Sequence, residues 1–458
     1  MGQSNRLAAN LCTSKRKTQE CGMKSSSHFT VFEYGHLVSE EGDARINNAV
    51  VLPADLFKWL ELRCLKDDAD NTHRLLTLSS RNGVKTLQVK NYAGVISLPG
   101  GRFLEILPKT GQDNEDTVRQ QLLMMLRTLK SFRHIASSES GVKISKMPLM
   151  DIFIQQFIES VRKIVQRGLK RDYLRQEDNL PWMKGRLRIS AQLSKNCIRR
   201  DRFQVEYDEY SVNRLENRIL KTAINKISRQ TSNPQLLQQI TQLQFHFENI
   251  TSVHDAYIAF EQLHFDRHMH HYEQALAWAK MILLGDSPHC MYGDVYAFSL
   301  LFPMEAVFES FVTTWMRYRY YDKWRVDAQV SSKNLISYNG KALFKLRPDI
   351  CLRPRKSTTG SVITCDVKWK IVNGRKDSLE QSQADLYQML AYGLNYQEGE
   401  GDMILIYPYH NGFNQPSPHP YEFSHQKENR LRLWVVPFFI GESLQTSELR
   451  FPSGAEFI

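Results

Sequence analysis

The N-terminal part of the chain alternates apolar and polar residues in short runs, which is the period of half-buried strands. Over residues 29–112 these runs are separated by two turn signals, Asn82-Gly83 and Pro99-Gly100-Gly101. The first is typical of a two-residue hairpin. One helix over 53–65 interrupts the strands. The pattern predicts a β-rich domain over 29–112, preceded by a flexible basic tail over 1–28.

A helical spacing of apolar residues replaces the strand period from about residue 113 to 295. Apolar side chains recur at i, i+3 and i+4 from Val118 to Leu129 and from Ile152 to Ile164, which places them on one face of a helix. Further helices are predicted over residues 212–230, 234–263 and 270–284. We therefore expect a helical middle domain over 113–295.

The last part of the chain, residues 296–458, mixes the two periods. The pattern predicts, in order, a helix over 303–320, strands over 325–338, 341–352 and 361–371, a helix over 377–397, and strands over 402–409 and 431–440. Asn339-Gly340 joins the first two strands as a hairpin turn. Helices that flank the strands of one sheet predict an α/β core. The whole chain is thus expected to be an α+β protein of several domains.

Composition and charge fit a globular protein that binds a polyanion. The 458 residues are 42% hydrophobic and 24% charged, which excludes a disordered or collagen-like chain. Lys and Arg number 60 against 49 Asp and Glu, and the net charge of +11 favours nucleic acid as a partner. The seven dispersed cysteines suit a reducing compartment, and no apolar run reaches the roughly 18 residues of a membrane span. We expect a cytoplasmic protein with no membrane partner.

Candidate catalytic residues lie on the strand predicted over 361–371. Side chains alternate along a strand, so Asp366 and Lys368 share one face, roughly 6.6 Å apart. Asp349 ends the preceding strand, where pairing of adjacent strands can bring it beside Asp366. Two carboxylates and an ammonium group predict a site for a hard divalent cation, with Asp349 and Asp366 as its ligands. Mg²⁺ is the expected ion, with Mn²⁺ as the alternative.

The order and spacing of these residues match the PD-(D/E)xK nuclease signature, Pro348-Asp349 followed by Asp366-x-Lys368. Glu309, on the helix before the sheet, stands where this superfamily often has another acid. Gln388 and Tyr392, on the helix after the sheet, fit its QxxxY element. The alternatives are a solvated ion pair for Asp366 and Lys368, a structural role for Glu309, and helix packing for Gln388 and Tyr392.

The chain resembles the McrC family, the nuclease subunits of McrBC-type modification-dependent restriction systems. The resemblance covers roughly residues 29–440. It rests on three blocks, residues 92–96 with 104–109, residues 185–187 with 213–221, and the motif residues with 385–392. It implies a C-terminal PD-(D/E)xK endonuclease that cuts double-stranded DNA with catalytic residues Glu309, Asp349, Asp366, Lys368, Gln388 and Tyr392.

The resemblance also implies a partner, an McrB-like AAA+ GTPase ring. In such systems the ring recognises and translocates DNA. McrC docks into the ring by its N-terminal part, stimulates GTP hydrolysis and cuts the DNA. The sequence agrees on one point, because it contains no GxxxxGK[ST] loop. GTP is therefore expected on the partner and not on this chain.

A basic segment over residues 162–202 carries thirteen Lys and Arg against four acids. It is interpreted as a surface for DNA phosphates or for an acidic partner, with a solvated helix face as the alternative. Three functions compete for the whole chain: a partner-gated Mg²⁺-dependent endonuclease, a non-catalytic docking and GTPase-activating scaffold, and a stand-alone RecB-like nuclease.

Overall fold

The computed structural model describes most of the chain. It covers residues 28–40, 49–66, 75–111, 114–129, 147–265, 269–284, 299–355, 361–372, 383–423 and 430–452. The predicted basic tail over 1–28 lies outside the described residues, apart from His28, which begins the first strand. Several sheets and many helices make this a mixed α/β protein, in agreement with the predicted α+β class.

The N-terminal part contains two four-stranded sheets. Its elements are β1 (His28–Phe32), β2 (His36–Ser39), β3 (Ala49–Leu52), α1 (Ala54–Lys66), β4 (Leu76–Arg81), β5 (Val84–Val89), β6 (Tyr92–Leu98) and β7 (Arg102–Leu107). The sheets have the strand orders β3-β2-β5-β4 and β1-β7-β6-β11. Both predicted hairpins are present, and Asn82 and Gly83 have the positive φ angles (52° and 78°) that the β4–β5 turn requires.

The second N-terminal sheet is completed by a strand that the sequence pattern did not predict. Strand β11 (Ser299–Pro303) pairs antiparallel with β6, although about 200 residues separate the two. Gly94 of β6 permits this pairing, because a Cβ atom there would lie 1.9 Å from the carbonyl oxygen of Leu300. The chain therefore returns to the N-terminal sheet before the C-terminal domain begins.

The middle part is a helical bundle with one projecting arm. Its helices are α2 (Glu115–Leu126), α4 (Leu149–Arg167), α6 (Leu215–Ile227), α7 (Pro234–His246), α8 (Ala256–Glu261) and α9 (His270–Leu284). Their apolar faces share a continuous core with the sheet formed by β1, β6, β7 and β11. The helix predicted over 234–263 is in fact divided into α7 and α8. Across the described residues, no helix combines the length and hydropathy required to traverse a bilayer.

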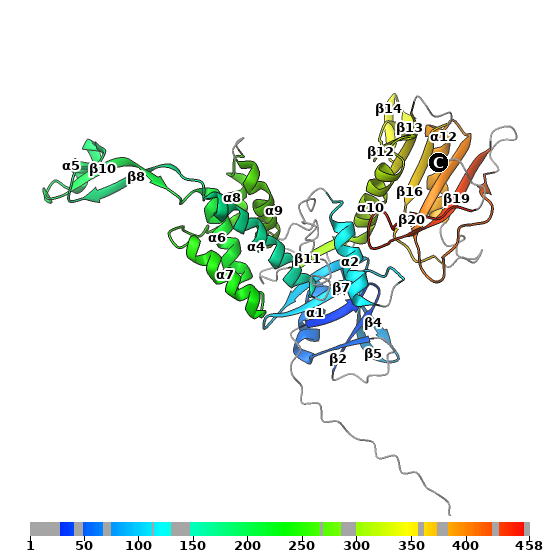
Figure 1. Cartoon of the computed structure of the whole chain (residues 1–458), viewed down its shortest axis with the longest axis horizontal. Helices are drawn as coiled ribbons and strands as arrows, with labels where there is room; N and C mark the ends of the chain where they lie inside the picture. Colours follow the sequence, from blue (N-terminus) through cyan, green and yellow to red (C-terminus); the bar gives the residue numbers. More distant parts are fainter. Residues whose placement is uncertain are drawn as a thin grey trace, which may run out of the picture.

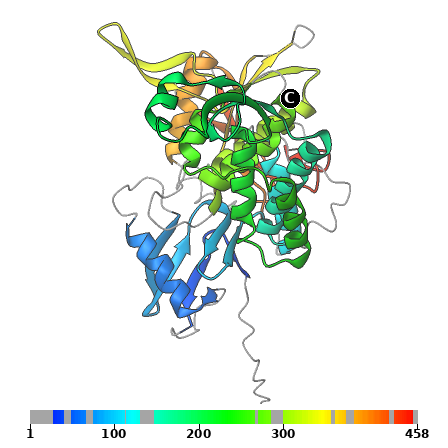
Figure 2. The same cartoon turned by 90° about the vertical axis from the view of Figure 1, so that its left-hand side faces the viewer.

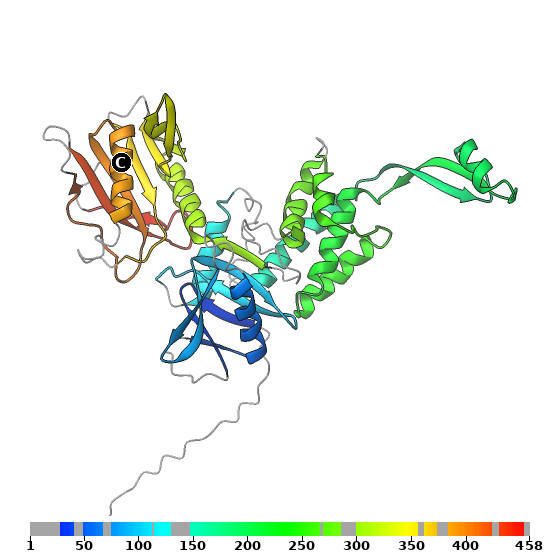
Figure 3. The same cartoon turned by 180° about the vertical axis from the view of Figure 1, so that it is seen from behind.

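The arm corrects the prediction of a wholly helical middle domain. It consists of β8 (Asp172–Leu180), β9 (Arg186–Leu187), the short helix α5 (Ile189–Lys195) and β10 (Phe203–Ser211). Strands β8 and β10 pair along their whole length as a long antiparallel ribbon. Figures 1 and 3 show this ribbon projecting away from the bundle. Most of the basic segment lies here, so its interpretation as a solvated helix face is wrong for this stretch.

The C-terminal part is a seven-stranded sheet with a helix on each face. Its elements are α10 (Met304–Arg319), β12 (Trp324–Ala328), β13 (Lys333–Tyr338), β14 (Lys341–Leu346), β15 (Ile350–Pro354), β16 (Ile363–Val367), α12 (Gln383–Tyr396), β17 (Gly401–Pro408), β18 (Tyr421–Glu422), β19 (Leu431–Phe439) and β20 (Glu448–Leu449). The strand order is β12-β15-β16-β17-β19-β18, and β20 also pairs with β19. Apolar residues of α10 pack with one face, and those of α12 with the other.

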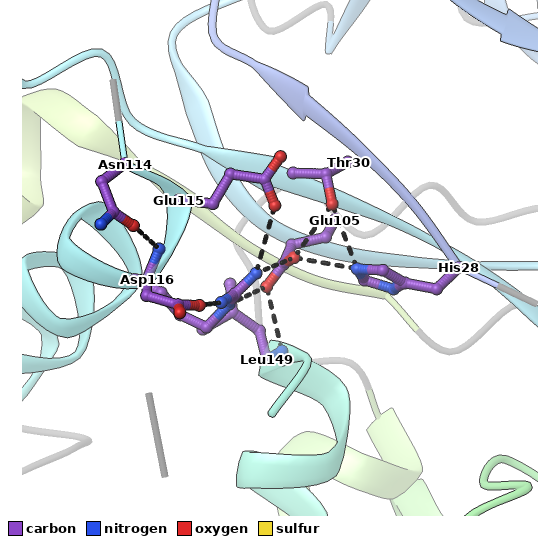
Figure 4. Close-up of polar contacts among 8 residues, drawn as sticks. His28, Thr30, Glu105, Asn114, Glu115, Asp116 and Leu149 are labelled. Carbon is purple, nitrogen blue, oxygen red and sulfur yellow. Dashed lines mark hydrogen bonds and ion pairs between the residues drawn. The ribbon is translucent and has the colours of Figure 1, made fainter. Parts of the chain in front are cut away.

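A buried ionic network joins the N-terminal sheet to the helices (Figure 4). Glu105 on β7 is fully buried and accepts hydrogen bonds from two guanidinium nitrogens of Arg119 on α2, at 2.8 and 2.9 Å. It also pairs with His28 on β1 and accepts a hydrogen bond from the backbone N–H of Leu149, the first residue of α4. One carboxylate therefore ties together two strands and two helices.

Candidate active site

The pairing of β15 with β16 brings Asp349 and Asp366 together. The two strands run antiparallel with Ile350 opposite Cys365, so one further step along this register places Asp349 beside Asp366. The backbone N–H of Val367 donates a hydrogen bond to Oδ2 of Asp349 at 2.9 Å. The juxtaposition predicted from adjacent strands is present in the structure.

Lys368 and Asp366 also lie together, on one face of the sheet. The Nζ atom of Lys368 is 2.8 Å from Oδ2 of Asp366, and the Asp366 side chain is 1% exposed. Cys365, Val367 and Trp369 occupy the opposite face, in the core that includes α10. A pair this deeply buried is not the solvated ion pair considered as an alternative, because an exposed strand face would leave both side chains in water.

Glu309 on α10 is linked to Asp349 through a residue that the sequence did not single out. Gln329, directly after β12, donates hydrogen bonds from Nε2 to Glu309 and, at 3.4 Å, to Oδ1 of Asp349. Its own backbone N–H donates to the carbonyl oxygen of Asp349 at 2.8 Å. Gln329 has a φ angle of 54°, a conformation that non-glycine residues rarely adopt. Only the sheet register identifies this residue, so no sequence signal pointed to it.

Gln388 and Tyr392 on α12 contact the strand end beside the aspartates. The Gln388 amide donates to the Tyr392 hydroxyl at 2.7 Å, and this hydroxyl donates to the carbonyl oxygen of Arg347 at 3.0 Å. The pair thus holds the segment that leads into Pro348 and Asp349. These contacts fit a supporting role, and they also satisfy the helix-packing alternative.

A second ion pair, between the exposed Lys370 and the buried Asp385, lies close to the first. Asp385, at the start of α12, accepts two hydrogen bonds from Nζ of Lys370 at 2.9 and 2.8 Å, and a third from the Tyr407 hydroxyl. The sequence analysis gave Asp385 no role of its own. Its position three residues before Gln388 was the available signal, because residues at that spacing lie on one side of a helix.

The pKa values of the three carboxyl groups in the site are all raised. Burial, reinforced by the charges of Asp366 and Glu309, raises the pKa of Asp349 to about 8. Burial likewise raises the pKa of Asp366 and that of Glu309 above their ordinary values. Burial alone would lower the pKa of Lys368, but the neighbouring Asp366 raises it. Raised carboxyl pKa values of this kind are typical of a site that needs an additional cation.

The residues present fit a divalent cation. Apart from Lys368 and the neighbouring acid Asp349, the described residues offer the buried Asp366 carboxylate no hydrogen-bond partner. Such an unsatisfied anion is costly unless a cation compensates it, and carboxylate oxygens are the ligands that Mg²⁺ prefers. The described part of the chain contains no cluster of three or more His, Cys, Asp or Glu side chains arranged to hold an ion. The candidates to hold a cation here are the two neighbouring carboxylates of Asp349 and Asp366.

Comparisons with known proteins agree on one family. The family model described as McrBC 5-methylcytosine restriction system component matches residues 87–408, more than half of the chain. A solved structure described as a half-complex from the tetradecameric assembly of Thermococcus gammatolerans McrB AAA+ hexamers with bound McrC is similar, with a TM-score of 0.62 and 19% identity over 91% of this chain and 95% of that chain. A chain of the cryo-EM structure of the Thermococcus gammatolerans McrBC complex gives a TM-score of 0.47 and 22% identity over 65% of this chain and 89% of that chain. No curated protein matches the sequence.

Proposed function

The chain belongs to the family of McrBC 5-methylcytosine restriction system components, and from this premise we propose that it is the nuclease subunit of such a system. Its proposed reaction is Mg²⁺-dependent hydrolysis of phosphodiester bonds in double-stranded DNA. The observation that carries the proposal is the convergence of Asp349, Asp366 and Lys368 at one end of two paired strands. Family membership gives the biological context, and these three side chains give the chemistry.

The proposed fold of the C-terminal part is a PD-(D/E)xK nuclease core. In support, the antiparallel strands β12, β15 and β16 continue into the parallel strands β17 and β19 of one sheet. Helices α10 and α12 cover its two faces, and together with the sheet they supply all six residues of the proposed site. A mixed sheet of this kind presents acids from neighbouring strands to one substrate.

The proposed catalytic roles follow from the contacts. Asp349 and Asp366 would hold the cation, which when bound polarises a phosphate oxygen and lowers the pKa of water. The Lys368 ammonium, paired with Asp366, is placed to stabilise the negative charge that develops on the phosphate. Gln329 orients Asp349 and Glu309 relative to one another. Gln388 and Tyr392 fix the strand end that carries Asp349.

The proposed partner is an McrB-like AAA+ GTPase ring, which would bind GTP. The Thermococcus structure contains McrC bound to McrB AAA+ hexamers, and this chain has no phosphate-binding loop of its own. We place one docking surface on the N-terminal domain and a second on the arm. Trp182, Leu193 and Ile198 on the arm are 60–90% exposed, and exposed apolar side chains favour a protein contact.

A reconstituted cleavage assay tests this function. Linear and plasmid DNA, methylated or unmethylated, are incubated with the chain, with and without the ring partner, GTP and Mg²⁺. Cleavage that requires all three supports a partner-gated nuclease. Cleavage without the ring would favour a stand-alone nuclease. Stimulation of the partner's GTPase without any cleavage would favour the scaffold function and contradict the proposal.

A further inference from the structure

A β-ribbon leaves the sheet between two residues of the proposed site. Gln329 ends the segment after β12, Asp349 precedes β15, and the chain between them forms β13 and β14, joined by the Asn339-Gly340 turn. The base of this ribbon is fixed, because the Tyr396 hydroxyl of α12 lies within hydrogen-bonding distance of the carbonyl oxygens of Val330 and Leu346, at 3.1 and 3.0 Å. The ribbon is therefore anchored beside the strand end that carries Asp349.

The ribbon is exposed on both of its faces. All residues from 335 to 345 are exposed, including Tyr338 at 68% and Phe344 at 71%. In Figure 1 the two strands stand beside β12 at one end of the C-terminal domain, and in Figure 2 this ribbon extends beyond the sheet. A two-stranded ribbon that is exposed on both faces has no hydrophobic core in which its aromatic and aliphatic side chains could be buried. Their exposure indicates a surface that contacts another molecule.

The charge of the ribbon indicates which kind of molecule binds it. The stretch from residue 328 to 348 contains Lys333, Lys341, Lys345 and Arg347, and no Asp or Glu. The register pairs Tyr338 with Lys341 near the turn and Asn334 with Lys345 nearer the base, so one lysine lies beside the aromatic residue and a second lies closer to the sheet. A second copy of the chain would present the same cations to this surface in a symmetric contact. The positive charges of two copies would repel each other, whereas a polyanion is attracted to the same lysines and arginine.

We propose that the β13–β14 ribbon lies in a groove of the DNA duplex and positions the scissile phosphate at Asp349 and Asp366; this rests on the proposed nuclease function. A two-stranded ribbon has the width that the major groove admits. Lys341 and Lys345 contact phosphates, and Tyr338 lies against the sugars and base edges between them. Because such contacts are mainly electrostatic, they hold the duplex without selecting a sequence.

The test is the salt dependence of duplex binding by the full chain in complex with its ring. In the double variant Lys341→Ala and Lys345→Ala, the slope of log K against log salt concentration should decrease by about 0.9 for each lysine. Cleavage at limiting DNA should fall at least tenfold and recover at saturating DNA, with the partner's GTPase unchanged. The matched control removes the same charge from exposed basic residues of the helical bundle, Arg229→Ala with Lys280→Ala, and should bind and cleave as the wild type does.

The outcomes separate this proposal from the function on which it rests. A reduced slope in a complex that never cleaves DNA would support the ribbon and reject the nuclease. Normal cleavage with an unchanged slope and affinity in the double variant would overturn the ribbon proposal alone. A change in the mass of the assembly, without a change in DNA affinity, would assign the ribbon to contact between copies and also overturn it.

Discussion

Glu105 and Asp366 are both almost fully buried, and their surroundings give them opposite characters. Burial alone would raise the pKa of Glu105, but the hydrogen bonds and charges of Arg119 and His28 lower it to about 2. Burial raises the pKa of Asp366, and besides Lys368 its carboxylate is in hydrogen-bond contact with Asp349, another buried acid. A fully paired carboxylate stabilises a fold, whereas an under-paired one indicates a functional site.

Substitution of the two acids should therefore change stability to very different extents. Glu105→Ala leaves the Arg119 guanidinium buried without its main partner and should lower the free energy of unfolding by about 3–5 kcal/mol. Asp366→Ala removes one of several mutually repelling charges and should change it by less than about 1 kcal/mol. Chemical denaturation of both variants measures this. An equal loss of stability in the two would contradict the distinction.

At the scale of elements, local signals predicted well and long-range pairing did not. Asn82-Gly83 and Asn339-Gly340 marked real hairpins because their backbone geometry is set by the two residues alone. Strand β11 and the arm escaped prediction because their pairing partners, not their own periodicity, make them strands. The same holds for the site, where Asp349, Asp366 and Lys368 were found by motif, whereas Gln329 enters only through the sheet register.

Gly94 offers a test of the pairing that closes the N-terminal sheet. A Cβ atom at this position would meet the Leu300 carbonyl oxygen at 1.9 Å, so Gly94→Ala should displace β11 and lower the melting temperature by several degrees. Gly101→Ala is the matched control, because Gly101 also has a positive φ angle but nothing lies within 4 Å of its Cβ position. If both variants melt alike, backbone strain and not the approach of β11 determines the stability at Gly94.

At the scale of the whole molecule, a buried hydrogen-bond contact connects the N-terminal sheet to the segment that carries Asp366 and Lys368. The indole N–H of Trp369 donates to both oxygens of Glu33, at 3.1 and 3.0 Å. The Trp369 ring also packs edge-on against Phe308, with centroids 5.0 Å apart. Trp369 directly follows Lys368, and Phe308 directly precedes Glu309. A shift of the N-terminal part would therefore reach two residues of the site.

This junction predicts a pH dependence. Burial raises the pKa of Glu33 from 4.5 to about 8, so the folded chain keeps a proton that the unfolded chain loses. The stability supplied by this proton is fully present below pH 4.5 and is lost as the pH rises to about 8. Glu33→Gln cannot titrate, so the stability of the wild type relative to this variant should decline over that window. Parallel melting curves from pH 5 to 8.5 measure the difference, and a constant difference would contradict the assignment.

We propose that the site of Asp349, Asp366 and Lys368 cuts DNA, whereas the N-terminal domain and the arm contact the ring partner. The most direct measurement follows DNA cleavage and GTP hydrolysis in the same reaction, with the reconstituted complex, Mg²⁺ and either wild type or Asp366→Asn. Asp327→Asn, a substitution on β12 outside the site, is the matched control. We predict that Asp366→Asn abolishes cleavage and leaves GTP hydrolysis at the wild-type rate. Cleavage by Asp366→Asn at the rate of the wild type would contradict the account.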